Sequence, residues 1–478
     1  MPVRKAALVW AVVAACAAAA ACGDNEAGGG APDASALPTW RMDLAPSSVM
    51  GERRGLEPAR GIIHLHSPYS HDACDGQPRV DETGPIDEDC LADLRAGLCT
   101  TRMDYAALTD HDATMADEAF EDLFLVRGGD QLVMVDDEPV ASRLACDGGG
   151  EVLLTVGGEN PIMPIMLDRH VTGSPEERHA IYDGDDPAAV AAFRDAGATV
   201  WIPHSEQRTA AEVEALEPDG IEVYQLHANL DPDIREEFLG LDRSGAIEAA
   251  IEFADLQEDG PVPDLALLSF LAENTPSLAV WDALLASGRH IAGSAGSDAH
   301  QNALPIMLRD GERGDSYRRV MRWFSNVVLA SDRSDPAAIE EALRAGRLFV
   351  AFELMGTPAG FDVRADIPGQ DPVELGGSVS AAAGATLEVA VPTVLDLDPT
   401  LPPPSISARI LHIPPGGEPA VVAEGAGPAL SAPLDAPGAY RVEIHIVPLH
   451  LAPYLGTLGP AYAEKTHPWI YASPIYVE

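Results

Sequence analysis

Short apolar runs of strand length recur through the first three quarters of the chain, and each run ends in a group of polar residues. The runs Val152–Val156 and Ala198–Ile202 are typical, because each holds five residues, of which four are apolar and three are β-branched. Between the runs lie segments with the signals of helix ends. Asp186-Pro187 begins one such segment and Gly197 ends it, as N-cap, first-turn proline and C-terminal glycine preferences predict. Similar segments run from Thr275-Pro276 to Gly288 and from Asp335-Pro336 to Gly346.

This alternation of strands and helices predicts a parallel β-sheet. In an open doubly wound sheet the ligands gather at one switch point. In a closed α/β barrel, functional groups come from the carboxyl ends of many strands. The polar groups of this chain follow several strands in order, so the pattern favours a barrel-like α/β domain.

The polar groups contain the side chains that bind transition metals. His64 and His66 stand at alternate positions after an apolar run, so on a strand both imidazoles lie on one face and reach one cation. Later runs end in Thr109-Asp110-His111-Asp112, Gly158-Glu159, Pro203-His204 and Ser297-Asp298-Ala299-His300. Imidazoles with nearby carboxylates form the ligand set of zinc, manganese and iron hydrolases. We therefore predict an enzyme.

Taken in order, these motifs resemble the PHP (polymerase and histidinol phosphatase) superfamily over roughly residues 59–350. The resemblance implies a distorted seven-stranded (β/α) barrel that holds two or three divalent metal ions, expected to be zinc, manganese or iron. It also gives Asp110 the role of supporting the adjacent histidine, and Asp110 is our candidate catalytic residue. The metal ligands that it implies are His64, His66, Asp72, His111, Glu159, His204, Asp298 and His300.

The ligand set leaves two positions open. One further histidine is expected between Glu159 and His204, and we predict His170 over His179 because His170 follows the apolar run Ile162–Leu167. In the first motif His71 precedes Asp72, so His71 is the alternative to Asp72 as a ligand.

Another strand-like run carries Glu222 and ends at His227. Glu222 is a candidate for supporting the site from outside the ligand set. We interpret His227 as incidental and leave it out of the predicted site.

Metal ions bridged by a carboxylate such as Glu159 lower the pKa of a shared water and offset charge on substrate oxygens. The expected reaction is hydrolysis of a small-molecule ester, with phosphate esters the class that the resemblance implies. Carbamate or carboxylic ester hydrolysis at the same metals is an alternative, and so is ligand binding without turnover. We interpret the arginines near the motifs as ion-pair partners rather than a phosphate clamp; they are Arg169, Arg208, Arg309 and Arg313.

The amino terminus has the pattern of a bacterial export signal. Arg4-Lys5 precedes an alanine-rich apolar run that is too short for an anchor helix, so residues 1–21 are predicted to be a signal peptide. Cys22 follows small residues and is the expected site of lipid attachment; Cys16 and ordinary cleavage near Ala21 are the alternatives. Residues 22–58 are predicted to be a tether and linker. The protein is thus expected to be exported and anchored to a bacterial membrane, facing the periplasm or the cell surface.

The remaining cysteines, an even number in a chain expected to be exported, predict disulfides. They are Cys74, Cys90, Cys99 and Cys146, and they allow three pairings. No Cys-x-x-Cys spacing suggests a metal site among them.

The net charge excludes one class of partner. The chain has 76 acidic and 30 basic residues and a formal charge of −46. Such a surface repels nucleic acid and anionic lipid, so a polymerase-associated or nuclease role is not expected.

Near Gly356 the helix signals stop, and proline, glycine and alternating apolar residues take over. We therefore predict a hydrolase domain over residues 59–355 and a β-sandwich over residues 356–478, which packs on the barrel or binds a surface ligand. The expected sandwich strands are Leu387–Val394, Ser407–Ile413, Tyr440–Val447 and Ile470–Val477.

Overall fold

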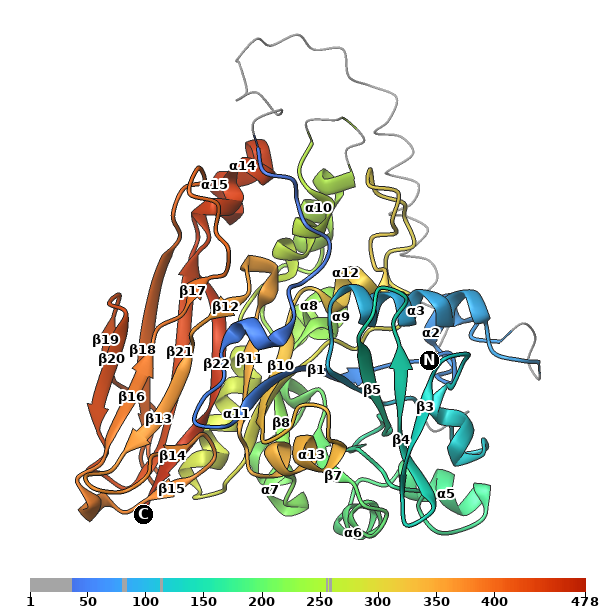
Figure 1. The fold of residues 1–478 in the computed structure, drawn as a ribbon, viewed down its shortest axis with the longest axis horizontal. Coiled ribbons are helices and arrows are strands. Elements are labelled where there is room, and N and C mark those ends of the chain that lie inside the picture. The colour runs from blue at the N-terminus through green and yellow to red at the C-terminus, as the bar shows by residue number, and fades with distance from the viewer. Residues whose placement is uncertain (1–36, 80–83, 112–114, 255–256, 258–259) are drawn as a thin grey trace.

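The computed structural model describes residues 37–79, 84–111, 115–254, 257 and 260–478, and they form a mixed α/β fold rich in β-structure (Figure 1). The predicted signal peptide, Cys16 and Cys22 lie outside the described residues. Among the residues described, no helix combines the length and apolarity needed to cross a membrane.

Two sets of parallel strands follow from the apolar runs. The first set is β1 (Glu57–Leu65), β2 (Tyr105–Leu108) and β5 (Glu151–Val156). The second set is β7 (Thr199–Ile202), β8 (Gly220–Gln225) and β9 (Ala292–Gly296), with β6 (Met163–Ile165) added antiparallel to β7. The predicted parallel pairing of successive strands is present in both sets.

The two sets belong to separate sheets. Their edges are joined by two isolated bridges, one between Leu65 and Ala299 and one between Val156 and Leu167. A continuous seven-stranded barrel ladder is therefore not seen in the described residues, and the closed barrel stays a prediction.

The predicted helix signals coincide with helix ends. Asp186 caps α6 (Pro187–Asp195), and Asp335 caps α13 (Pro336–Arg344) through backbone N–H groups. Gly197, after α6, has a φ of +96°, which a side chain disfavours. The cap of α11 (Thr275–Ala286) is Asn274, one residue before the predicted start.

The other α-helices are mostly short. They are α2 (Ala73–Gly76), α3 (Glu88–Thr100), α5 (Pro175–Tyr182), α7 (Ala210–Leu216), α8 (Leu226–Leu230), α9 (Pro232–Glu237), α10 (Gly245–Ile251), α12 (Tyr317–Met321), α14 (Ala452–Leu455) and α15 (Gly459–Tyr462).

The larger sheet has twelve strands and runs from the first parallel set into the C-terminal part of the chain, at the left of Figure 1. In this sheet β11 pairs with β22, so hydrogen bonds connect the parts on either side of residue 356. Its further strands are β3 (Gln131–Val135), β4 (Glu138–Ala145), β10 (Ser325–Ala330), β11 (Leu348–Ala351), β15 (Ser378–Val379), β18 (Ser405–Ile413), β19 (Ala420–Gly425), β21 (Gly438–Val447) and β22 (His467–Val477).

A smaller sheet forms a second layer in the C-terminal part. Val363 and Leu387 of this sheet join the same apolar cluster as Ile410 and Ile444 of the larger sheet. Its strands are β13 (Asp362–Asp366), β14 (Val373–Glu374), β16 (Thr386–Ala390) and β20 (Ala429–Pro433), and a separate pair is β12 (Pro358–Ala359) with β17 (Thr393–Val394). The four strands expected after residue 386 correspond to β16, β18, β21 and β22.

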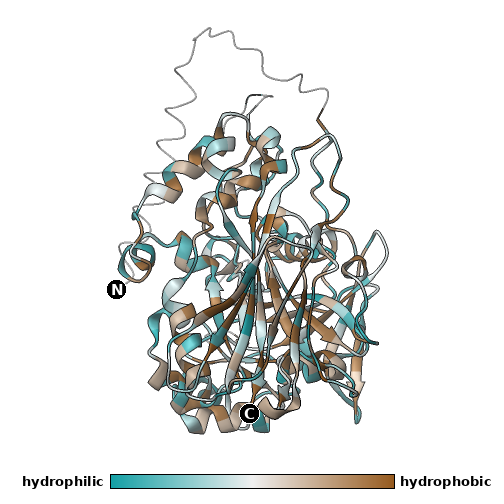
Figure 2. Cartoon of the chain, turned by 90° about the vertical axis from the view of Figure 1, so that its left-hand side faces the viewer, coloured by the Kyte–Doolittle hydropathy of each residue, from teal (hydrophilic) through white to brown (hydrophobic). Residues whose placement is uncertain are grey.

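A compact apolar cluster lies between the two parallel sets. Its largest side chains are Tyr105 and Trp201, both fully buried. Glycines make room for them: a Cβ on Gly61 would lie 2.1 Å from the Tyr105 ring, and one on Gly220 would lie 2.1 Å from the Trp201 ring. Figure 2 shows apolar residues along the strands in the middle of the molecule, with hydrophilic residues on the surrounding helices and loops.

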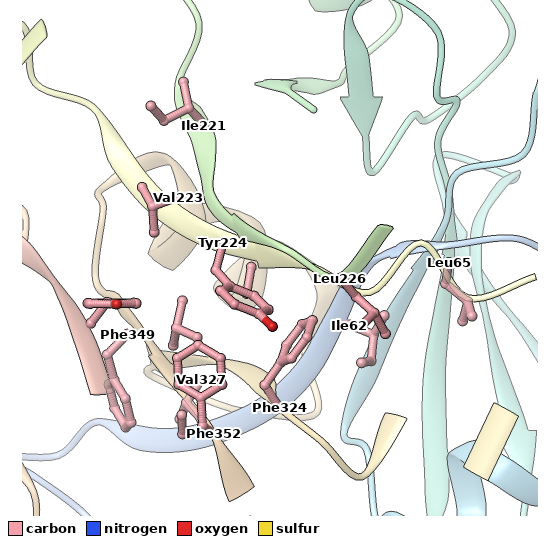
Figure 3. Packing of buried hydrophobic residues seen from close by; sticks show 14 of the residues in the cluster. Ile62, Leu65, Ile221, Val223, Tyr224, Leu226, Phe324, Val327, Phe349 and Phe352 are labelled. Carbon is pink, nitrogen blue, oxygen red and sulfur yellow. The ribbon is translucent and has the colours of Figure 1, made fainter. Parts of the chain in front are cut away.

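Two irregular strands separate apolar from polar side chains. The pairing of β1 shifts register between Ile62 and Leu65, and that of β8 shifts between Glu222 and Tyr224. Ile62 and Leu65 are an odd number of residues apart, yet both join the apolar cluster of Figure 3, as Val223 and Tyr224 also do. The irregularities turn these apolar residues to the core and leave His64, between Ile62 and Leu65, and Glu222, before Val223, for another role.

The four remaining cysteines form two disulfides. Cys74 pairs with Cys90, and Cys99 pairs with Cys146. The structure thus selects one of the three pairings that the sequence allows.

A buried ion pair holds the start of the first parallel strand. Arg60 of β1 donates from Nε and Nη2 to both oxygens of Glu353, at 2.6 and 2.8 Å, and both side chains are fully buried. Ser325 and Thr357 donate to the same carboxylate, at 2.6 and 2.7 Å. Each oxygen of the Glu353 carboxylate therefore accepts two hydrogen bonds.

We predict that Glu353→Gln lowers the free energy of unfolding by about 3–5 kcal/mol, because it leaves a buried guanidinium without its counter-charge. The matched control is Glu424→Gln, which breaks the exposed pair with Arg409 and is expected to cost less than about 1 kcal/mol. Urea unfolding followed by circular dichroism measures both. Equal losses in the two variants would contradict the prediction.

Candidate metal centre

Histidines and carboxylates from six strands converge in one cluster. Parallel strands bring their carboxyl ends to the same edge, so side chains that follow them meet there. The residues are His64 and His66 at the end of β1, His111 after β2, Glu159 after β5, His204 after β7, His227 after β8, and Asp298 and His300 after β9. Asp72, in the loop after β1, completes the cluster.

Asp298 lies at the centre of the cluster. Its Oδ1 is 3.0 Å from Nε2 of His300, 3.1 Å from Nε2 of His66 and 3.3 Å from Nε2 of His64. Its Oδ2 is 2.8 Å from Nδ1 of His227. Nε2 of His204 lies 3.7 Å from the same Oδ2, so one carboxylate faces five imidazoles.

A second group forms around Asp72. Its Oδ2 is 3.3 Å from Nε2 of His300 and 3.5 Å from Nε2 of His111. With His66, these residues offer four ligand atoms that lie within 4.8 Å of one another. His71 is exposed, and its ring centroid is 5.0 Å from that of His111. Of the two alternative ligands in the first motif, Asp72 and His71, the structure places Asp72 in the group.

Glu159 lies between two parts of the cluster. Its Oε2 is 3.1 Å from Nδ1 of His111, and its Oε1 is 3.3 Å from Nε2 of His204. His64, Glu159 and His204 form one possible ligand group, and His204, His227 and Asp298 form another. Glu159 therefore occupies the position expected of a bridging carboxylate.

The side chains fit the expected metal ions. Nε2 of His64 and of His66, both buried, makes no hydrogen bond among the described residues. Burial lowers the pKa of His66 to about 3, so its imidazole is neutral and offers a lone pair. Burial raises the pKa of Glu159, but the hydrogen bond from His204 and the charges of His204, His64 and His111 together outweigh it and lower the pKa to about 2. Against the opposing effect of burial, nearby carboxylates raise the pKa of the other cluster histidines, which are His64, His111, His204, His227 and His300, so these carry protons that a bound cation would displace. Neutral imidazoles and ionised carboxylates are the forms that bind zinc, manganese or iron.

Glu222 positions two of the histidines. Its Oε1 is 2.7 Å from Nδ1 of His64, and its Oε2 accepts a hydrogen bond from the backbone N–H of His204 at 3.0 Å. A carboxylate on one ring nitrogen fixes the imidazole with the other nitrogen toward a metal. A Cβ on Gly296 would lie 2.1 Å from Oε1 of Glu222, so only glycine leaves room for this carboxylate.

Asp110 faces the turn after β1. Its Oδ1 accepts the backbone N–H of Ser67 at 2.5 Å, and its Oδ2 accepts the Ser67 hydroxyl at 2.7 Å. Burial raises the pKa of Asp110 to about 6. The ring of His111, which Asp110 was expected to support, instead has Nδ1 2.7 Å from the backbone oxygen of Glu159. Asp110 thus supports the loop between the first ligands rather than a ligand ring.

His170 lies apart from the cluster, in contrast to our expectation. Its Nδ1 is 3.1 Å from the Tyr182 hydroxyl, and its Nε2 is 3.1 Å from the backbone oxygen of Glu118. The reason is strand direction: the apolar run before His170 contains β6, which is antiparallel to β7 and so ends at the opposite edge. The alternative His179 contacts Asp117 instead, at 3.2 Å.

His227 lies in the cluster, although we interpreted it from the sequence as incidental. His227 follows β8 by one residue and so obeys the rule that identified the other ligands. Its position directly after a strand could have identified it as a ligand. We assigned the remaining ligand position to His170 instead.

The arginines near the motifs are engaged with protein groups. Arg208 pairs with Asp185 at 2.8 Å, and Arg313 pairs with Asp75 at 2.8 Å. Arg309 donates to the backbone oxygen of Pro261 at 3.1 Å, and Arg169 donates to that of Asp195. Arg208 and Arg313 thus form ion pairs as we interpreted them, whereas Arg169 and Arg309 contact backbone oxygens.

Comparison with known proteins gives little further identification. No protein-family model and no curated protein matches the chain. Among solved structures, a two-domain protein from Bacteroides vulgatus ATCC 8482 that contains a predicted PHP-like metal-dependent phosphoesterase is 11% identical, with a TM-score of 0.35, over 92% of this chain and 100% of that one. PsfC from Pseudomonas syringae PB-5123 is 12% identical, with a TM-score of 0.30, over 57% of this chain and 82% of that one. Similarity at this level establishes neither a shared fold nor an activity for this chain.

We predict that the purified protein, prepared without chelator, contains two or three transition-metal ions per chain by plasma mass spectrometry. A His64→Ala, His66→Ala double variant should lose most of them. His227→Ala should also lower the content, because its imidazole contacts Asp298, whereas His170→Ala should retain the parent's metal. A loss in His170→Ala with none in His227→Ala would contradict this assignment of ligands.

Proposed function

We propose that this protein is a metal-dependent hydrolase of small-molecule esters, and that phosphate esters are its substrate class. The observation that carries the proposal is the overlap of the ligand groups, which share His64, His66, His204 and Asp298. Shared ligands hold neighbouring cations close together, as in hydrolases that use two metals. The resemblance of the ordered motifs to the PHP superfamily agrees with this function.

The candidate ligands fall into groups that would hold different ions. His66, Asp72, His111 and His300 would hold one ion, while His64, Glu159, His204, His227 and Asp298 would hold its neighbours. Bound divalent ions would supply a water of lowered pKa and would polarise the substrate oxygen. Glu222 keeps His64 and the His204 backbone in place, and Asp110 keeps the Ser67 turn in place, so the ligands need little reorganisation.

We further propose that β1, β2, β5, β6, β7, β8 and β9 form a distorted seven-stranded ring. The bridges Leu65–Ala299 and Val156–Leu167 support this closure. In such a ring the cluster lies at the carboxyl ends of the strands, where barrel enzymes bind their substrates.

Hydrolysis of a carbamate or carboxylic ester at the same metals is the second candidate. It is favoured by the contacts of the nearby arginines, because Arg208 and Arg313 are already paired with carboxylates. A phosphate dianion would then depend on the metal ions for its charge compensation. A neutral ester makes no such demand.

We propose, in addition, that the protein is exported and lipid-anchored at Cys22, with its small ester substrate outside the cytoplasm. The alanine-rich run that precedes Cys22 and the polar residues that follow it support this proposal. The formal charge of −46 argues against nucleic acid as a partner.

We predict that the metal-loaded protein hydrolyses p-nitrophenyl phosphate or bis(p-nitrophenyl) phosphate faster than p-nitrophenyl acetate. Removal of the metals by a chelator, or the Asp72→Asn substitution, should lower kcat/KM at least about 1000-fold, because metal ions contribute several kcal/mol to transition-state stabilisation. His412→Ala, in β18, is the control and should keep full activity. Metal-dependent cleavage of the acetate alone would select the second candidate, and no turnover of any ester would overturn the proposal.

We predict that cells expressing the full chain in a bacterial host incorporate labelled palmitate into it and retain it in the membrane fraction. Cys22→Ala should abolish both, because it removes the thiol expected to carry the lipid, and Cys16→Ala should leave both unchanged. Labelling that persists in Cys22→Ala would contradict the assignment of the anchor.

A further inference from the structure

The Cys74–Cys90 disulfide is attached to the loop that carries the candidate ligand Asp72. Cys74 is two residues after the ligand Asp72, and both half-cystines are buried, with 8% and 6% of their surfaces exposed. The partner Cys90 belongs to the first turn of α3. The bond therefore joins the ligand-bearing loop to a helix that carries none of the ligands.

The loop around Cys74 is hydrogen-bonded to the backbone of the segment that carries another ligand, His300. The N–H of Cys74 donates to the backbone oxygen of His300 at 2.9 Å, and the N–H of Asp75 donates to that of Gln301 at 3.0 Å. Asn302 donates to the backbone oxygen of Asp72 at 2.9 Å. Displacement of Cys74 would thus move Asp72 and His300 together.

The loop has an unfavourable backbone conformation. Cys74 and Asp75 have φ values of 55° and 59°, in the left-handed region that non-glycine residues rarely adopt. Two consecutive residues of this kind need restraint from their surroundings. The disulfide supplies such a restraint at Cys74, and Arg313 supplies another at Asp75, at 2.8 Å.

The disulfide also touches a residue that holds two ligands. Sγ of Cys90 is 3.9 Å from the hydroxyl of Tyr317. That hydroxyl lies 2.9 Å from the backbone oxygen of His66 and 3.3 Å from that of His300. The disulfide is therefore linked to three members of the Asp72 group: to Asp72 through the chain, and to His66 and His300 through Tyr317.

We infer that the Cys74–Cys90 disulfide is a positioning element of the metal cluster. It fixes Asp72 beside His66, His111 and His300, so this ligand group reaches full metal affinity only in the oxidised chain. The inference rests on the proposed metal-dependent function and adds to it a dependence on the thiol redox state.

The second disulfide provides the matched control. Cys99 lies at the other end of α3, and its bond to Cys146 spans 47 residues, against 16 for Cys74–Cys90. The longer loop predicts the larger effect on the unfolded chain. If metal binding followed global stability alone, loss of Cys99–Cys146 would weaken it at least as much.

The experiment compares metal affinity and melting temperature in the full mature chain. Cys74→Ala, Cys90→Ala removes the first bond and leaves no thiol there to bind metal, while Cys99→Ala, Cys146→Ala removes the second. Zinc titration against a chromogenic chelator should show at least one ion bound about 10-fold more weakly in the first variant, the scale found when an outer partner of a metal ligand is lost. The second variant should bind as the parent does, even though its melting temperature falls.

Equal affinity in the two variants, or a loss that follows melting temperature, would overturn the inference and leave the proposed function intact. A parent chain that binds no metal would overturn the proposed function and this inference with it.

A second measurement avoids any failure of the first variant to fold. Metal-loaded protein is treated with a water-soluble trialkylphosphine: the S–S bond breaks, the sulfurs take two electrons from phosphorus and two protons from water, and the water oxygen ends in the phosphine oxide. Mass spectrometry after thiol alkylation follows each disulfide, and the chelator follows released metal. Release should accompany reduction of Cys74–Cys90 and should not accompany reduction of Cys99–Cys146. Retention of all metal after Cys74–Cys90 is reduced would overturn the inference.

Discussion

The buried carboxylate of Asp298 is the constraint on which the site depends. Its two oxygens face His64, His66, His300 and His227 within 3.3 Å, so ligands from three strands meet at a single residue. The surrounding imidazoles, chiefly His300 and His64, hold the pKa of Asp298 well below its usual range, against the opposing effect of burial. Removal of this charge would leave several buried imidazoles without a common partner.

The apolar core determines whether these side chains can reach Asp298. The register shifts in β1 and β8 allow residues such as Leu65 and Tyr224 to enter the core of Figure 3 while their neighbours His64 and Glu222 face the site. Bulges commonly redirect side chains in this way next to active sites. The packing of Tyr224 against Phe352, at a centroid distance of 4.9 Å, therefore also fixes the strand that carries Glu222.

The sequence predicted most of this site because one rule was sufficient for most of it: a metal-binding side chain follows a parallel strand. His66, His204 and Asp298 all obey that rule. The rule failed at His170, since strand direction depends on which strands pair, and the sequence does not state that β6 is antiparallel to β7. Composition likewise showed β-structure after residue 356, but it contained no sign that β22 pairs with β11 and extends the N-terminal sheet. Long-range pairing was the missing information in both cases.

Arginine distinguishes this cluster from the other carboxylate groups of the fold. Asp264, Asp310 and Glu312 also bring oxygens close enough for a metal ion. Arg318 and Arg319 are bound to that group, however, and already offset most of its negative charge. Within the part of the chain that the structure describes, no guanidinium contacts Asp298, whose neighbours are imidazoles and the amide of Gln225. A buried carboxylate needs a compensating cation. Protonated His64 and His300 supply that charge in the metal-free protein, and on losing their protons they would direct lone pairs toward a metal ion. The same acidic chemistry therefore forms a structural ion pair where arginine reaches it and a cluster that could hold metal ions where histidine does.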